Sequence, residues 1–201
     1  MLEYVLIGGG FALAAAAQPG PLQAFLIARV AADGWRRTLP AALAPVISDG
    51  PIALLVLVVL HNVARGFESF LKAVGGLVFL YLAGRTLGEW RHARAGEAPE
   101  AQSAPRTLLQ AVAVNIVNPG PYLGWSLILG PLALEAWDES PAHVAALVLS
   151  FYATMVVSLG LFILLVGTTT RLGPRVRQHL LLVSSVALAG IAFYSLWSAF
   201  S

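Results

Sequence analysis

Long apolar runs without charged side chains dominate this sequence. Four such runs contain no Asp, Glu, Lys or Arg: Tyr4 to Ala28, Thr107 to Leu134, Ser140 to Thr170 and Gln178 to Ser201. A fifth run, Thr38 to Leu60, carries Asp49 in its middle, and a sixth, Gly66 to Gly88, carries Lys72 and Arg85 near its ends. A helix needs about 20 residues to cross the hydrocarbon core of a bilayer. The pattern therefore predicts six transmembrane helices.

The composition excludes a soluble protein. Of the 201 residues, 58% are hydrophobic and 11% are charged, whereas soluble domains average about 25% charged residues. Six crossings use about 120 residues, which leaves short loops and no room for a soluble domain. The chain has no cysteine, which excludes disulfides, thiolate metal sites and dithiol relays. We predict an all-α integral membrane protein in the lipid bilayer, with no cofactor.

The basic residues predict an orientation. Loops alternate between the two sides of a membrane, and cytoplasmic loops carry the excess of Lys and Arg. One side of the predicted topology holds only Arg65 and Lys72. The other side holds ten basic residues: Arg29, Arg36, Arg37, Arg85, Arg91, Arg94, Arg106, Arg171, Arg175 and Arg177. Both termini are therefore expected outside, and because these charges sit in short loops, nucleic-acid binding is not indicated.

A short motif occurs twice, one hundred residues apart. The two copies are Gln18-Pro19-Gly20-Pro21 and Asn118-Pro119-Gly120-Pro121. A weaker echo relates Gly75-Gly76 in the third span to Ser184-Ser185 in the sixth. Each half then holds three spans, and because three is odd, the second half enters the membrane from the opposite face. We predict an inverted-topology repeat: residues 1–90 and 107–201, joined by a cytoplasmic linker at 91–106.

Inverted repeats are typical of secondary transporters, whose binding sites lie near the midplane between discontinuous helices. Proline removes a backbone donor and clashes with the preceding helical turn, so both Pro-Gly-Pro motifs are expected to break their helices, the first and the fourth. Each break would leave a helix N-terminus whose free N–H groups suit a substrate carboxylate, and freed carbonyls that suit an ammonium group. The alternative is a duplicated helical scaffold that transports nothing.

The predicted substrate-binding residues are those of the two breaks and one amide a turn earlier. They are Gln18, Pro19, Gly20, Pro21, Asn115, Asn118, Pro119, Gly120 and Pro121. For each amide, satisfying the broken backbone is as good an interpretation as touching substrate. Cavity-lining, lipid-facing and packing roles are all compatible with four residues of the second half: Tyr122, Trp125, Ser150 and Tyr152.

Asp49 is the one ionisable side chain well inside a predicted span. An intramembrane carboxylate is costly and is treated as functional by default, so Asp49 is a candidate proton carrier that would couple transport to a proton gradient. The competing interpretation is structural, because Ser48-Asp49-Gly50-Pro51 also has the pattern of an N-cap followed by a restarting helix. No nucleophile–base pair or paired carboxylates can be assembled at one depth, which argues against an enzyme.

The sequence resembles the LysE/RhtB family of amino-acid exporters over nearly its full length. The resemblance rests on Pro19-Gly20-Pro21, Asp49, Tyr81-Leu82-Ala83-Gly84 and Asn118-Pro119. It implies a protein of the bacterial cytoplasmic membrane that exports amino acids or related small solutes, driven by proton exchange, with Asp49 and both motifs around the substrate. Ser48 stands where the family usually has Gly, and Gly120-Pro121 follows where a basic residue is common, so the chain is a divergent member.

An exporter of metals or inorganic ions, as in the wider superfamily, is the alternative function. One carboxylate without a Cys, His or Met partner makes a poor divalent-metal site, so no bound metal is predicted. A homodimer would be compatible with a membrane protein of this size.

Overall fold

The computed structural model describes residues 1–59, 65–96, 101–170 and 173–200, and its elements in these ranges are all helices. The first half contains α1 (Leu2–Ala17), α2 (Pro21–Asp33), α3 (Trp35–Thr38), the 3-10 helix η1 (Leu39–Leu43), α4 (Ala44–Val59) and α5 (Arg65–Arg94). The second half contains α6 (Ala104–Ile116), α7 (Pro119–Gly124), the π-helix η2 (Trp125–Leu129), α8 (Gly130–Glu139), α9 (Pro141–Thr170) and α10 (Pro174–Phe200). The all-helical prediction is therefore confirmed for the described residues.

Within the described residues, three helices are long and apolar enough to cross a membrane: Trp35–Val56, Pro141–Thr170 and Pro174–Ala199. The pair Leu2–Ala17 and Pro21–Asp33, bent by 62°, adds a fourth crossing if it forms one broken span. Many large apolar side chains point outward from these helices, for example Leu13, Leu161 and Phe193. Such a surface suits lipid rather than water.

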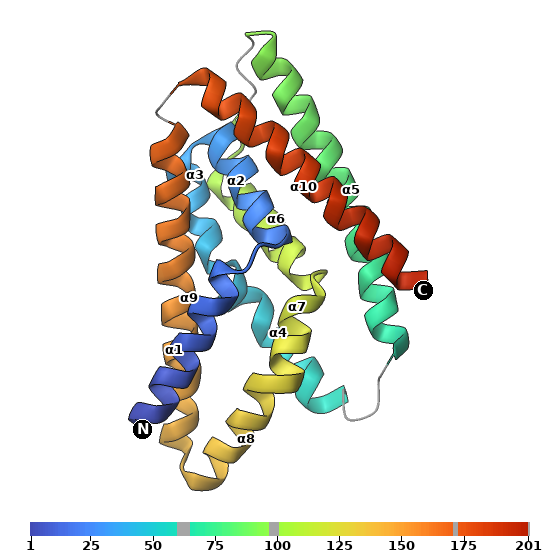
Figure 1. Ribbon diagram of the computed structural model, residues 1–201. Helices are drawn as coiled ribbons and strands as arrows, with labels where there is room; N and C mark the ends of the chain where they lie inside the picture. Colours follow the sequence, from blue (N-terminus) through green and yellow to red (C-terminus); the bar gives the residue numbers. More distant parts are fainter. Residues whose placement is uncertain (60–64, 97–100, 171–172, 201) are drawn as a thin grey trace.

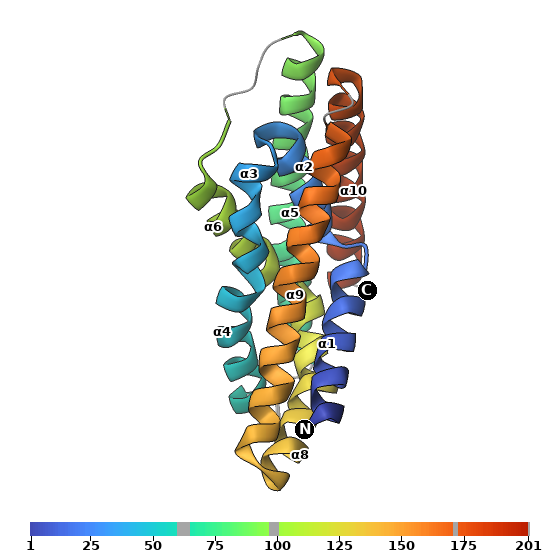
Figure 2. The same ribbon diagram turned by 90° about the vertical axis from the view of Figure 1, so that its left-hand side faces the viewer.

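The helices form an elongated bundle (Figures 1 and 2). The C-terminal ends of α2, α5 and α9 lie at one end of it, together with the N-terminal ends of α3, α6 and α10. The N-terminus and the junction of α8 with α9 lie at the opposite end. Successive long segments therefore run in alternating directions.

Small residues allow close contacts of α5 with α10 and with the end of α6. A Cβ atom on Gly76 of α5 would lie 2.7 Å from the Leu196 side chain of α10, and one on Gly75 would lie 2.6 Å from the carbonyl oxygen of Val117. On the other side of the α5–α10 contact, the Ser185 hydroxyl donates to the Ala83 carbonyl at 2.9 Å. Gly76 and Ser185 thus lie where α5 and α10 pack together, whereas Gly75 faces the end of α6.

A group of charged and polar side chains ties α2 to α5 and to the segment before α6. Its members, the Arg29 cluster, are Arg29, Asp33, Arg85, Glu89 and Gln102. Arg29 is 2% exposed; it pairs with Asp33 at 3.1 Å and also with Glu89. The Gln102 backbone N–H donates to Asp33 at 2.8 Å. The Gln102 side-chain amide is assigned the orientation in which its oxygen accepts from the two neighbouring arginines, Arg29 and Arg85.

The predicted linker begins and ends inside helices. Helix α5 continues to Arg94 and α6 begins at Ala104, so 91–106 overlaps both. Four sequence predictions fall wholly or partly outside the described residues: the end of the second span at Leu60, part of the 91–106 linker, the charge at Arg171 and the last residue, Ser201. The side chain of Arg65 also lies outside the described part of the structure.

Candidate functional site

The first helix is interrupted where the sequence predicts it, between Ala17 and Pro21. The carbonyls at the end of α1 are largely satisfied, because the Gln18 N–H donates to two of them at 3.1 and 3.3 Å. The side chain of Gln23, on the far side of the interruption, donates to the Ala16 carbonyl at 3.1 Å. These hydrogen bonds occupy carbonyl oxygens at the end of α1, so few of them remain free to bind the ammonium group that the sequence pattern predicts there.

The N-terminus of α2, in contrast, has free donors. Gly20 precedes it in extended conformation and supplies no side-chain cap, and Pro21 at the first position has no N–H to donate. The backbone N–H groups of Leu22 and Gln23 have no acceptor among the described residues. A 13-residue helix with such an uncapped start favours a negatively charged partner.

The second interruption differs from the prediction in position and in chemistry. It falls at Val117 and Asn118, and Pro119-Gly120-Pro121 forms the first turn of α7 instead of breaking a helix. The reason is that proline is well tolerated at the start of a helix, where its missing N–H would have no partner. The Asn118 side chain accepts from the Gly120 N–H at 3.2 Å and caps α7.

On the other side of this interruption, the carbonyl group at the end of α6 also has a hydrogen-bond donor within the chain. The Tyr122 hydroxyl donates to the Ile116 carbonyl at 2.9 Å. Asn118 therefore satisfies the interrupted backbone, and the six-residue α7 offers no open N-terminus comparable to that of α2.

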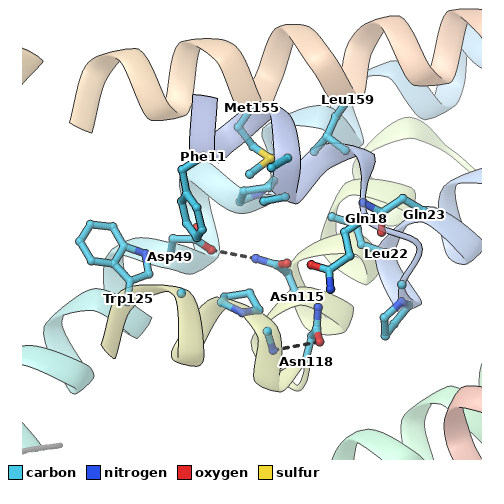
Figure 3. A pocket seen from close by; sticks show the side chains of 18 of the residues that line it. Phe11, Gln18, Leu22, Gln23, Asp49, Asn115, Asn118, Trp125, Met155 and Leu159 are labelled. Atoms are coloured by element: carbon cyan, nitrogen blue, oxygen red, sulfur yellow. Dashed lines mark hydrogen bonds between the residues drawn. The ribbon is translucent and has the colours of Figure 1, made fainter. Parts of the chain in front are cut away.

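A cavity of about 480 Å³ lies between the two interruptions (Figure 3). The predicted residues that line it are Gln18, Pro19, Gly20, Pro21, Asp49, Asn115, Asn118, Gly120 and Pro121. Pro119 is the one member of the predicted set that is not among the lining residues. The sequence pattern thus brings both motifs and the intramembrane acid to one cavity.

The remaining walls of the cavity are mostly apolar. Phe11 of α1 and Phe151, Met155 and Leu159 of α9 line it, and none of these was singled out from the sequence, because they look like ordinary apolar positions of a span. Gln23 was also missed, although an amide within an apolar run was a usable signal. Among the described residues, Asp49 is the one charged side chain of the lining.

Asp49 is 3% exposed and is held by side chains of two helices. Its Oδ1 accepts from Asn115 Nδ2 at 2.8 Å, and the same amide nitrogen donates to Ser48 Oγ at 2.7 Å. The Ser48 hydroxyl in turn donates to the Ala44 carbonyl at 2.9 Å. Asn115 therefore contacts the acid directly, and its position at the end of α6 ties α6 to α4.

The capping interpretation of Asp49 is wrong. Helix α4 begins at Ala44 and continues through Asp49 and Pro51 to Val59. Proline inside a helix removes one backbone hydrogen bond, but here it does not end the helix. The Asp49 carboxylate consequently has no helix start to cap and faces the cavity.

The structure shows which of Tyr122, Trp125, Ser150 and Tyr152 line the cavity. Trp125 lines the cavity and is 6% exposed, whereas the Ser150 hydroxyl bonds within its own helix, to the Leu147 carbonyl at 3.0 Å. Tyr122 supports the second interruption, and Tyr152 packs edge-on against Phe151. One of the four, Trp125, therefore belongs to the cavity wall.

Among the described residues, no three His, Asp or Glu side chains come together as a metal site requires.

Comparison with known proteins identifies the family of this chain. No curated protein and no solved structure matches the chain. The family model described as LysE type translocator matches residues 13–198, a range that includes both interruptions and every residue of the cavity except Phe11. The chain therefore belongs to the LysE family of translocators, membrane proteins that export small solutes.

Proposed function

We propose that this protein exports amino acids or related small zwitterionic solutes from the cytoplasm in exchange for protons. The observation that carries the proposal is the cavity itself, which combines an uncapped helix N-terminus with a single acid. A volume of about 480 Å³ falls within the range of small-molecule sites.

The substrate carboxylate binds at the start of α2. No Lys or Arg lines the cavity among the described residues, so the donors available to an anion are backbone and neutral side-chain groups. The N–H groups of Leu22 and Gln23 supply two such donors, reinforced by the helix dipole. Gly20 supports this role because it has no side chain that could accept from the N–H groups of the first turn of α2.

Asp49 carries the proton. A carboxylate at the midplane that binds and releases a proton as substrate moves can couple the two gradients. Asn115 supports this role, since its amide donates to Oδ1 and leaves Oδ2 without a hydrogen bond among the described groups.

We further infer that residues 1–90 and 107–201 form two inverted three-helix halves and that both termini face outside. The paired interruptions and the contact of α5 with α10 support the repeat. The gathering of the ends of α2, α5 and α9 at one end of the bundle supports the orientation, because the predicted cytoplasmic arginines occur in the C-terminal parts of these helices or after them.

Transport in proteoliposomes tests the proposal. Purified protein is reconstituted with an imposed pH gradient, and uptake of radiolabelled amino acids is compared with uptake by empty liposomes. We expect accumulation that collapses when a protonophore is added, and we expect Asp49→Asn to lose gradient-driven accumulation. Asp138→Asn, at an exposed acid of α8, is the matched control and should behave as the wild type.

Two outcomes would overturn the proposal. The first is equal accumulation by Asp49→Asn and wild type, which would remove the proton-coupling role. The second is transport of manganese, nickel or cadmium ions without transport of any amino acid, which would favour the metal-exporter alternative.

A further inference from the structure

The Trp125 indole nitrogen is a buried hydrogen-bond donor without an acceptor. Trp125 is 6% exposed, and its Nε1 makes no hydrogen bond of normal geometry with a described group, although Asp49 and Tyr152 lie close to the indole. An indole N–H can only donate, and leaving such a group buried and unpaired is costly. A donor of this kind on a cavity wall indicates that its acceptor arrives with a ligand or with water.

The backbone around Trp125 directs the ring toward the cavity. The segment Trp125–Leu129 is a π-helical turn between Gly124 and Gly130. A π-turn inserts one extra residue into the helical repeat and so changes the direction of the side chains beside it; such turns are frequent at functional sites. Figure 3 shows the indole nitrogen on the side of the ring that faces Asp49.

Trp125 and Asp49 lie at one end of the cavity, and Leu22 and Gln23 lie at the other (Figure 3). Between these ends, Figure 3 shows the apolar side chains of Phe11 and Met155 together with the amide side chains of Gln18, Asn115 and Asn118. A solute whose carboxylate is bound at the start of α2 therefore reaches the Trp125 end with the far end of its side chain.

We propose that Trp125 determines the specificity of this site, because its indole N–H donates to an oxygen at the far end of the solute's side chain. The assignment rests on the proposed function, in which the carboxylate occupies the opposite end. The oxygen is a carbonyl or hydroxyl, since Asp49 beside it disfavours a second carboxylate. A solute of the same shape with a methyl group in place of the oxygen leaves the indole unpaired and binds more weakly.

Isosteric pairs of amino acids test this assignment. Threonine with valine, asparagine with leucine, and glutamine with methionine each differ mainly by side-chain hydrogen-bonding groups. For wild-type protein in proteoliposomes, we expect the KM of at least one oxygen-bearing member to be about tenfold below that of its apolar partner, the loss typical of one removed hydrogen bond. The Trp125→Phe variant keeps an aromatic ring but has no donor, so it should raise the KM of that member and leave its apolar partner nearly unchanged.

The readout is the KM ratio within each pair, which a purely structural role would not change. Trp137→Phe, at an exposed indole of α8, is the control and should keep the wild-type ratios. If Trp125 only positions Asp49, Trp125→Phe changes the pH dependence of transport equally for both members and keeps the ratio, and the assignment is overturned.

The wild-type ratios decide the question even if Trp125→Phe does not fold. A wild-type protein that transports both members of every pair with equal KM overturns the assignment but leaves the proposed function intact. A wild-type protein that transports no amino acid overturns the proposed function, and the assignment falls with it.

Discussion

Removing the Arg29 side chain tests whether the Arg29 cluster stabilises the fold. Arg29→Ala leaves the Asp33 and Glu89 carboxylates without their shared cation, in a place where Arg29 is 2% exposed and the Asp33 side chain 1%. Removing one partner of a buried ion pair typically costs about 3–5 kcal/mol, because the remaining carboxylates lose their countercharge; Arg85, 3.6 Å from Glu89, and the Gln102 N–H, which donates to Asp33, compensate for only part of that loss. At about 2–4 °C per kcal/mol for a chain of this size, Tm should fall by about 6–20 °C.

Thermal unfolding of the purified protein in detergent, followed by size-exclusion chromatography of heated samples, measures this shift. Arg91→Ala is the matched control, since Arg91 is an exposed arginine near the same end of α5. Its substitution should change stability by no more than about 0.5 kcal/mol. A triple variant, Arg29→Met with Asp33→Asn and Glu89→Gln, should recover part of the lost Tm, because both carboxylates are then neutral, although Arg85 loses its carboxylate partner.

A shift for Arg29→Ala no larger than that of Arg91→Ala would refute this reasoning. It would mean that the two carboxylates are neutral or hydrated without Arg29, so that the cluster contributes packing but little electrostatic stabilisation. A triple variant less stable than Arg29→Ala would refute it as well, since charge removal would then be harmful in itself.

Three further substitutions probe the close contacts and the interruptions. Gly75→Val should lower Tm by the equivalent of about 1–3 kcal/mol, because its Cβ would lie 2.6 Å from a backbone carbonyl, whereas Gly84→Ala, with nothing within 4 Å, should not. Asn118→Ala removes the cap of α7 and should cost about 1 kcal/mol in thermal unfolding, and an unchanged Tm would contradict the capping role. Gly20→Leu should abolish transport with little loss of Tm, because it fills the start of α2, while Gly10→Leu, in open space on α1, should transport normally.

The sequence predicted the helical class and most of the polar residues that line the cavity, for identifiable reasons. Apolar runs are the strongest signal in a membrane protein, because lipid cannot satisfy backbone groups outside helices. Pro19 and Gly20 mark the first interruption correctly since neither continues a helix well. Asp49 stood out because a carboxylate within an apolar run has few structural explanations.

Other features depend on contacts that a one-dimensional pattern does not contain. Arg29 was counted as an interfacial charge, since the sequence does not show that Glu89, sixty residues away, reaches it. The position of the second interruption was missed because Pro119 is compatible both with breaking a helix and with starting one. The apolar cavity wall around Phe151 was missed because cavity-facing and lipid-facing residues are alike in composition.

The Arg29 cluster also restricts how this bundle can move. It joins α2, α5 and the Gln102 segment by charge-assisted hydrogen bonds, so thermal motion should carry these three parts together as one rigid body. The cavity wall, by contrast, is contributed in part by α4 and α9, outside that body. The cavity can therefore widen toward the arginine-rich end in two ways. Either several polar contacts of the Arg29 cluster break at once, or α2, α5 and the segment around Gln102 slide together past the neighbouring helices. The second way leaves every ion pair of the cluster intact.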